Sequence, residues 1–501
     1  SWLPSAPLAY DPRAIWCVGY GLDTFDKLFT PRQLVALTTF CDLVAEARAR
    51  VLADARAAGL PDDGVPLAQG GRAANASADA VATYLAFAVG RSADRWCTIA
   101  SWQSAADFVR GAFARQALPM VWDYAEANPF SNSTSNWTGA IEWVSECLDT
   151  SPLTLVPGHA TQFDATELDE TSTGWLFCTD PPYYDNVGYA DLADFFYVWL
   201  RRCLGGIYPD LFATLLTPKG EELIASPYRH GGDKRQAQRF FEEGLRQAFA
   251  RLRAAQHPAY PATVFYAFKQ AEVDDDEDAN GNGAPAVAST GWETMLEGLL
   301  GAGFTVTGTW PMRSERAARS NAIASNALAS SIVLVCRPRP ADAPVATRRQ
   351  FLAALKTELP TALRTLQHGN IAPVDLAQAA IGPGMAVFSR YRQVLEADGQ
   401  PLRVRTALQL INAALDEVLA EQEAEFDAAT RWAVAWFEQY GMNEGPFGVA
   451  ETLSKAKNTS VEGMVEAGIV AAGGGKVRLR RREELGTPPT PAPPPTSGGG
   501  A

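Results

Sequence analysis

The sequence predicts an α/β protein in which helical subdomains flank the sheet. Between residues 174 and 339, strand patterns alternate with a helical pattern, the order typical of an α/β sheet. The first 130 residues and those after about 345 instead carry apolar residues at helical spacing. We therefore expect a helical subdomain, the sheet, a second helical region, a winged-helix-like module and a disordered Pro/Gly-rich tail, over residues 1–130, 131–340, 341–448, 449–485 and 486–501.

Composition indicates a soluble protein. The chain has 501 residues, of which 47% are apolar and 20% charged, and this length suits two or three domains. No stretch approaches the ~18 apolar residues of a membrane span, and the first residues do not resemble a signal peptide. Seven scattered cysteines without a C-x-x-C pair favour a reducing cytoplasm, and four dispersed histidines suggest no metal site.

The net charge of −14 limits how the chain could bind nucleic acid. Proteins that bind DNA through bulk electrostatics are basic, because binding releases counterions from the phosphates. Any DNA contact here would have to use local basic patches.

The first expected helix starts at Thr30, which with Gln33 forms a capping box, and Pro31 fits the first helical position. Further helices are expected within 77–102 and over 106–118, with a short possible strand at 14–21. The simplest interpretation of this region is a helical subdomain or lid.

The expected sheet contains four strands. A buried strand, "GWLFCT", covers 174–179, and a second covers 263–270. After an acidic loop at 274–283, Thr290 and Glu293 are expected to cap a helix that ends on glycine. The last two strands, 304–310 and 330–339, have no helix-length pattern between them, so they could pair antiparallel.

The C-terminal third is expected to be helical and to end in a small module. Helical patterns occupy 347–367, 403–426 and 430–441. Residues 448–485 then indicate two helices and a hairpin that turns at Gly473-Gly474-Gly475, an order similar to a winged helix. Its basic residues, including Arg478 and Arg480, could contact DNA, but a solvated hairpin or protein-contact surface is an equal alternative.

The most informative motif is Asp180-Pro181-Pro182-Tyr183, directly after the first expected strand of the sheet. Ligands of open α/β sheets bind at the carboxyl ends of strands. The two prolines also stiffen the loop and fix the direction of the Pro181 carbonyl. A carboxylate and a carbonyl could thus be held at this edge, next to an aromatic ring.

This motif resembles the catalytic signature of S-adenosylmethionine-dependent amino-methyltransferases that act on adenine or cytosine in DNA. The wider sequence, including "DPPYYDNVGYADLADFFYVWLRR", "PMVWDYAEANPF" and "NALASSIVLVCRPR", is similar to a large prokaryotic family of adenine-specific DNA methylases that contain a zinc ribbon. Members often accompany phage-defence genes. The resemblance covers about residues 10–485 and implies strands four to seven of a Rossmann-like class I methyltransferase sheet.

The resemblance also implies roles for individual residues. Asp180 and the Pro181 carbonyl would each accept one hydrogen of the exocyclic amine, and Tyr183, after Pro182, would stack on a base flipped out of the duplex. Tyr184 and Asp185 could line the base pocket. Asn-Pro-Pro-Tyr relatives modify glutamine or RNA, and the Asp here favours DNA. Adenine over cytosine rests on the resemblance alone.

One expected motif is missing. The family binds its cofactor through an Asp-Pro-Phe-x-Gly-x-Gly loop, which this sequence lacks; "CVGYG" (17–21) and "IGPGMAVF" (381–388) are more typical of turns. The expectation is therefore a carboxyl-terminal fragment whose cofactor site needs a companion chain or a missing N-terminal region. Such a half-sheet would expose an apolar edge strand.

Two further hypotheses concern DNA. A polar loop at 313–327 has three arginines that could follow a DNA backbone, although an ordinary basic loop is equally compatible; they are Arg313, Arg316 and Arg319. The alternative to an enzyme is a non-catalytic DNA-binding or assembly subunit of a restriction or phage-defence system.

Overall fold

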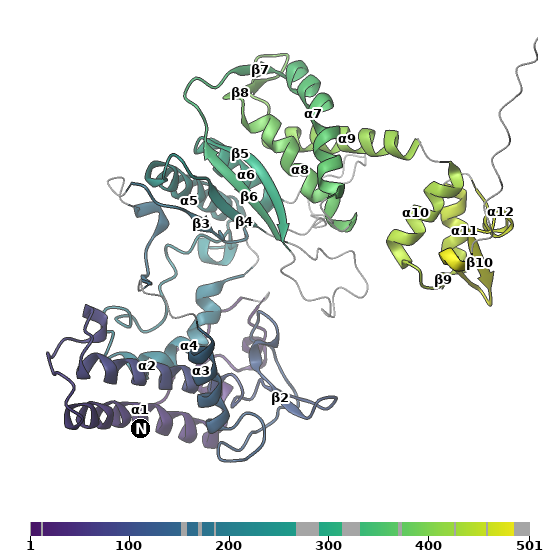
Figure 1. Ribbon diagram of the computed structural model, residues 1–501. Coiled ribbons are helices and arrows are strands. Elements are labelled where there is room, and N and C mark those ends of the chain that lie inside the picture. The colour runs from purple at the N-terminus through teal and green to yellow at the C-terminus, as the bar shows by residue number, and fades with distance from the viewer. Residues whose placement is uncertain are drawn as a thin grey trace, which may run out of the picture. The chain divides into compact units, whose positions relative to one another are not determined.

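The computed structural model has a mixed α/β fold (Figure 1). It describes residues 2–11, 14–151, 158–168, 173–184, 187–266, 290–312, 331–368, 373–424, 427–456 and 459–484. The chain forms two compact units: Ser1–Thr173 with Pro182–Ala255, called unit 1, and Gly174–Pro181 with Gln256–Ala501, called unit 2. The chain therefore passes from unit 2 to unit 1 between the two prolines of the Asp-Pro-Pro-Tyr motif.

Unit 1 is mostly helical. Its helices are α1 (Pro31–Ala57), α2 (Ala74–Ala93), α3 (Trp137–Thr150), α4 (Tyr189–Leu204) and α5 (Lys234–Ala255). A small hairpin joins β1 (Ser101–Gln103) to β2 (Phe108–Arg110). The predicted start of α1 is confirmed, because Thr30 and Gln33 form the reciprocal hydrogen bonds of a capping box and Pro31 is the first helical residue.

The core of unit 1 is built around α4. The aromatic residues that follow the Asp-Pro-Pro-Tyr motif form this helix, and Phe195 and Trp199 are fully buried in it. The ring of Phe29 stacks on Phe195 at 5.8 Å and meets Trp199 edge-on at 5.2 Å. These rings supply large apolar areas, so the helix beside the motif is firmly held.

Two expectations for unit 1 were wrong. The possible strand at 14–21 is instead a 3₁₀ helix, Cys17–Tyr20, closed by Gly21 at φ +88°. No α-helix forms over 106–118, where the chain instead has β2 and a short 3₁₀ helix, Ala112–Ala114. Asp94 holds this backbone: its carboxylate accepts from Phe113 N–H at 3.1 Å and its carbonyl from Ala112 N–H at 2.9 Å. Such local hydrogen bonds compete with helix formation.

The sheet of unit 2 has the strand order β3-β4-β6-β5. Its strands are β3 (Cys178–Thr179), β4 (Ala262–Tyr266), β5 (Phe304–Met312) and β6 (Ser331–Pro338). β3 pairs parallel with β4, whereas β6 is antiparallel to both β4 and β5. The predicted antiparallel pairing of the last two strands is confirmed.

The expectation of a buried strand over 174–179 was wrong. Only Cys178 and Thr179 are strand residues, and Trp175 and Leu176 are 55% and 63% exposed. These side chains are exposed because β3 lies at an edge of the sheet: within the described part of the chain it pairs with a strand on one side only. The resulting exposed apolar edge is the feature that a half-sheet was expected to show.

Unit 2 also contains four helices before the C-terminal module. They are α6 (Thr290–Gly301), between β4 and β5 in the chain, and α7 (Arg348–His368), α8 (Pro373–Ser389) and α9 (Val404–Ala424), after the sheet. Two short strands, β7 (Val345–Thr347) and β8 (Gln393–Leu395), pair in parallel. The interpretation of "IGPGMAVF" as a turn was wrong, because these residues lie inside α8. Gly382 and Gly384 instead allow close packing, since a Cβ would come within 1.9 Å of Thr309 and 2.4 Å of Ile411.

The C-terminal module has its own small core. It consists of α10 (Ala428–Tyr440), β9 (Gly445–Pro446), α11 (Phe447–Ala456), α12 (Val461–Glu466), β10 (Val470–Gly473) and β11 (Lys476–Leu479). Trp432 and Trp436 are fully buried and stack at 5.1 Å. The predicted hairpin is confirmed, with Gly474 and Gly475 at positive φ. The core around it also includes Trp432 and Trp436 of α10.

Candidate functional site

The unit 2 half of the motif lies at the carboxyl end of the edge strand. The Phe177 carbonyl accepts from Thr263 N–H at 2.9 Å, which fixes β3 beside β4. Asp180 follows directly and is exposed, whereas Pro181 is buried. The buried proline anchors the loop, so the acidic side chain is presented at the strand end where ligands of open sheets bind.

The unit 1 half of the motif is anchored through its tyrosines. Pro182, Tyr183 and Tyr184 are all partly buried. Tyr184 has φ +41°, a strained value for a residue with a side chain. Its carbonyl accepts from Ala225 N–H at 3.0 Å, and its ring meets Phe241 of α5 edge-on at 5.3 Å. The Tyr184 ring, expected in a base pocket, therefore packs on the core. Asp185 lies outside the described residues.

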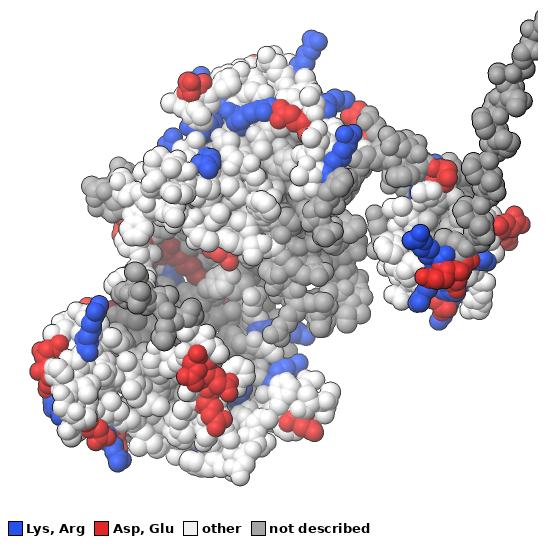
Figure 2. Space-filling model, in the orientation of Figure 1, with Lys and Arg blue, Asp and Glu red and all other residues white. Residues whose placement is uncertain are grey.

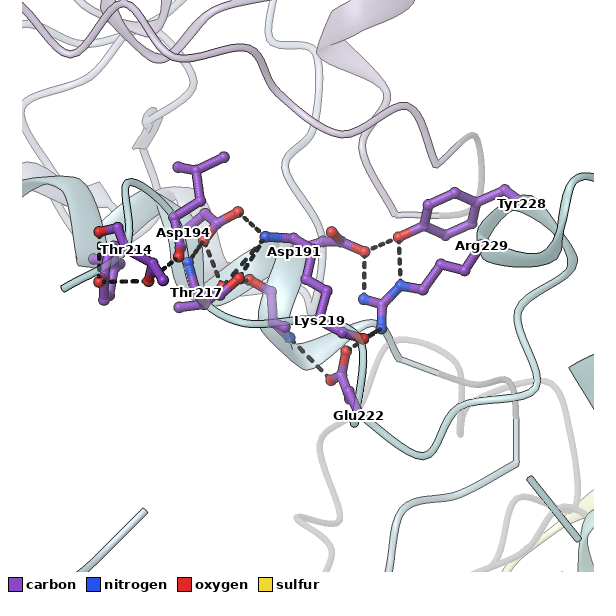
Figure 3. A network of polar contacts seen from close by, with 11 residues as sticks. Asp191, Asp194, Thr214, Thr217, Lys219, Glu222, Tyr228 and Arg229 are labelled. Atoms are coloured by element: carbon purple, nitrogen blue, oxygen red, sulfur yellow. Dashed lines mark hydrogen bonds and ion pairs between the residues drawn. The ribbon is translucent and has the colours of Figure 1, made fainter. Parts of the chain in front are cut away.

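A buried network of charges holds the segment after the motif (Figure 3). Asp191, at the start of α4, accepts from Arg229 Nη2 at 2.8 Å and also accepts from the Tyr228 hydroxyl. Arg229 also pairs with Glu222 at 2.6 Å, and Glu222 accepts from Ala190 N–H at 2.9 Å. The first turn of α4 is thus fastened to the loop that carries Tyr228 and Arg229.

A second acid of α4 extends this network. Asp194 accepts from Thr217 N–H at 2.8 Å, from the Thr217 hydroxyl at 2.5 Å and from Lys219 Nζ at 2.6 Å. Asp191 and Asp194 are each only 2% exposed. Buried carboxylates need such partners, because an unpaired buried charge is strongly destabilising. Residues 217–229 therefore form a brace, called the α4 brace below, and Ala225 of this brace also bonds Tyr184.

The network also changes proton affinities. Burial, followed by the hydrogen bond to Asp191, raises the pKa of Tyr228 above its usual range. Burial alone would lower the pKa of Arg229, but hydrogen bonds with Asp191 and Tyr228 raise it overall. Arg229 stays cationic and Tyr228 stays neutral at physiological pH, so the network acts as a fixed support and not as a proton relay.

Sequence reasoning missed this network. Asp191 and Asp194 stand three residues apart in an otherwise aromatic helix, a spacing that places both on one face. Two acids on a helix this rich in buried rings would have been a usable signal. Their partners come from a loop without any regular pattern, so the ion pairs of Asp191 and Asp194 could not be predicted from the sequence.

The structure describes only two of the arginines that were predicted to contact DNA. Arg313, Arg316 and Arg319 lie outside the described residues. Arg478 makes a bidentate pair with Glu484, at 2.7 and 2.8 Å, and Arg480 Nε donates to the Val470 carbonyl at 3.2 Å. Both arginines of the hairpin are therefore already engaged within the module.

The C-terminal module is electrically balanced. Residues 427–484 contain eight acidic and eight basic side chains. Figure 2 shows blue and red atoms next to each other on this module. The helix α12, which precedes the hairpin, carries Glu462 and Glu466 and no basic residue. This balance offers little of the positive potential on which DNA backbone contacts depend.

The described residues do not provide the cofactor loop of the family that the sequence resembles. Residues 17–21 form a 3₁₀ helix, and the glycines of 381–388 are used inside α8 for packing against Thr309 and Ile411. Neither segment joins a strand to a helix N-terminus, the arrangement that holds a nucleotide in Rossmann-like sheets. Neither of these two segments therefore has the form of that loop.

Comparison with known proteins gives one partial match. Residues 427–493 match a family described as a domain of unknown function (DUF8807). This range begins one residue before α10, in agreement with the packed module. Neither the curated proteins nor the solved structures contain a match to this chain.

Among the helices that the structure describes, none has both the length and the apolar character needed to span a bilayer. Within the same residues, His, Cys, Asp and Glu side chains form no group of three that could hold a metal ion.

Proposed function

We propose that this chain carries the catalytic loop of an S-adenosylmethionine-dependent DNA amino-methyltransferase, with the N6 amine of adenine as the expected target. The observation that carries the proposal is the placement of Asp180-Pro181-Pro182-Tyr183 directly after β3, at the carboxyl end of a parallel strand pair. The restriction or phage-defence setting rests on the sequence resemblance alone.

The strand order supports this proposal. The resemblance implies that this chain carries strands four to seven of a class I methyltransferase sheet. The order β3-β4-β6-β5, with β6 antiparallel to both neighbours, is compatible with such a part-sheet. Under this proposal Asp180 would follow the fourth strand, where the resembled family has its catalytic acid.

The chemistry assigned to the chain is positioning of the target amine. An exocyclic amine conjugated with its ring is a poor nucleophile. The Asp180 carboxylate and the Pro181 carbonyl would each accept one of its hydrogens and so direct the nitrogen lone pair. The half-buried Tyr183 ring would stack on the flipped base.

The methyl donor is expected to bind elsewhere. Because the described residues lack a cofactor loop, we propose that a companion chain or another segment completes the site. The exposed side chains of Trp175 and Leu176 beside the edge strand support this partner, since apolar edges of this kind are normally covered.

The test is methyl transfer from labelled S-adenosylmethionine to DNA, using protein purified with any chain that binds it. Asp180→Ala and Asp180→Asn should lower the rate by about 10²-fold or more, the usual effect of losing one aimed electrostatic group. Leu215→Ala, at a 73% exposed position of unit 1, is the control and should transfer normally. Normal transfer by Asp180→Ala would refute the assignment.

A non-catalytic assembly subunit is the second candidate. The observation in its favour is the separately packed C-terminal module, whose helix-strand-helix-helix-strand-strand order is that of a winged helix. Because Arg478 and Arg480 are already engaged, protein contacts suit this module better than DNA contacts. The absence of methyl transfer by the wild-type assembly, together with stable capture of a partner chain, would favour this candidate.

A further inference from the structure

Unit 2 contains a cavity that the proposed methyltransferase chemistry does not use. Its volume is about 340 Å³, at the lower end of the range of small-molecule sites. It is lined by the C-terminal end of α6, by Arg339 after β6, by residues 388–394 and by the start of α9. Asp180 follows β3, which is parallel to β4, whereas β6 is antiparallel to β4. Arg339 and the cavity therefore lie at the opposite end of the sheet from Asp180.

Arg339 is a fixed positive charge in this cavity. Its Nη2 donates to the Leu300 carbonyl at 2.6 Å, and its Nη1 donates to the Tyr391 carbonyl at 3.0 Å. Leu300 lies in the last turn of α6, where unpaired helix carbonyls attract cations. Both acceptors are neutral, so they hold the guanidinium in place without cancelling its charge. The bond to Tyr391 also fixes the segment that carries Arg392.

Two further arginines of the cavity have no acidic partner. Arg392 and Arg403 are exposed, and neither has a carboxylate within 4.0 Å among the residues that the structure describes. Arg405, two residues after Arg403, does not line the cavity and pairs with Glu293 at 2.7 Å. The guanidinium groups of Arg392 and Arg403 are thus available to a ligand.

The charges that line the cavity favour an anion. Among the described lining residues, three arginines stand against one acid, Glu297, which leaves a net charge of +2. This sign is opposite to the net charge of the chain, −14. The first turn of α9 adds the positive end of a helix dipole. A doubly charged anion would balance this site best.

A phosphate monoester has the required charge and shape. It carries about −1.5 to −2 at neutral pH, and the planar fork of a guanidinium binds phosphate oxygens in pairs. A terminal phosphate can enter a cavity end-on. A DNA phosphodiester carries only one charge and continues on both sides, so it suits an open groove better. A dicarboxylate spreads its two charges over two groups, which a cavity this small does not need.

From these observations we propose that the cavity binds a small phosphate monoester, with its phosphate held by Arg392 and Arg403 beside the fixed charge of Arg339. This site is separate from the Asp-Pro-Pro-Tyr loop and does not depend on methyl transfer.

The test is isothermal titration calorimetry of the full chain with inorganic phosphate and with glycerol 3-phosphate, at constant ionic strength. Both compounds should bind at a single site, glycerol should not bind, and added sodium chloride should weaken binding. Arg392→Gln and Arg403→Gln should each weaken binding by about tenfold or more, because each removes a charge-assisted hydrogen bond. Both side chains are exposed, so these substitutions should leave the fold intact.

Two controls make the result interpretable. Arg349→Gln removes the same charge from an exposed position of unit 2 that does not line the cavity, and it should bind like the wild type. Asp180→Ala should also bind normally, which separates this site from the proposed catalytic loop.

Three results would overturn the proposal. The first is that neither phosphate compound binds the wild type. The second is that Arg392→Gln and Arg403→Gln both bind as tightly as Arg349→Gln. The third is that glutarate, or a DNA duplex without terminal phosphates, displaces glycerol 3-phosphate as well as inorganic phosphate does.

Discussion

Arg229 and Asp191 form an ion pair whose two side chains are 12% and 1% exposed, with 2.8 Å between Nη2 and Oδ2. One partner belongs to the α4 brace and the other to the first turn of α4. Because Ala225 of the same brace bonds the Tyr184 carbonyl, this pair also supports the chain just after the Asp-Pro-Pro-Tyr motif. The buried ion pair therefore helps to fix the residue that directly follows the motif in unit 1.

Arg229→Met should loosen this support. The substitution leaves the buried carboxylates of Asp191 and Glu222 without their shared cation, a loss that typically destabilises by about 3–5 kcal/mol. Hydrogen exchange should become faster at the start of α4 and in residues 217–229. Arg246→Met, which removes an exposed pair with Glu243, is the control and should leave exchange unchanged. Equal hydrogen exchange in both variants at these residues would show that the network does not stabilise them.

Gly382→Ala should destabilise the packing of α8 on β5. The new Cβ would come within 1.9 Å of Thr309 Oγ1 and 2.1 Å of Thr309 Cγ2, so either the helix or the strand must shift. Overpacking of this kind typically costs about 1–3 kcal/mol. Thermal melting should register the loss, whereas Gly301→Ala, where a Cβ would meet nothing within 4 Å, should melt like the wild type or slightly higher.

Leu176→Lys should reduce self-association of the isolated chain. Leu176 is 63% exposed beside the edge strand β3, and burying a side chain of this size is worth roughly 1.5–3 kcal/mol. Sedimentation velocity over a range of concentrations should show association weakened by about tenfold. Leu215→Lys makes the same change at a 73% exposed position of unit 1. If both variants weaken self-association equally, the strand edge is not the surface through which the chain associates.

Glu484 should titrate at unusually low pH. Its hydrogen bond with Arg478, followed by that from the Arg481 backbone, lowers its pKa to about 2. The folded pKa lies below the unfolded value of about 4.3, so the pair stabilises the hairpin above that pH and its effect is lost as pH falls toward 2. Carboxyl NMR should show this midpoint in the wild type and a return toward 4.3 in Arg478→Gln.

A neighbouring pair provides the control for that titration. Lys476→Gln removes the contact with Glu444, at 3.2 Å, from the same hairpin and should not move the Glu484 midpoint. A midpoint near 4.3 in the wild-type protein would mean that Arg478 is available, and the arginine would return as a candidate for DNA contact.

Much of the fold could be predicted where the signal was local. The Thr30-Gln33 cap, the hairpin at Gly473-Gly474-Gly475 and the antiparallel last strands all depend on neighbouring residues or on short connections. Glycine and proline gave a wrong prediction at one place: Gly382 and Pro383 suggest a turn but lie inside α8. Their use is tertiary, because Thr309 and Ile411 occupy the space that side chains would fill.

The candidate site was predictable only in outline. The position of Asp180 after a strand follows from the pattern of residues 174–183. The exposure of Trp175 and Leu176 does not, because their apolar character is equally typical of a buried strand and only the pairing reveals an edge. Asp194 and Lys219 meet through a loop, and no local rule connects them.

The division of the chain has a consequence for its synthesis. Residues 174–181 belong to unit 2, but the next residues of that unit begin at Gln256, after the rest of unit 1 has been made. β3 thus leaves the ribosome some eighty residues before its partner β4, which at 5–20 residues per second is a delay of roughly 4–16 s. During that interval β3 has no β4 to pair with, so this edge of the sheet can only form after the chain of unit 1 is complete.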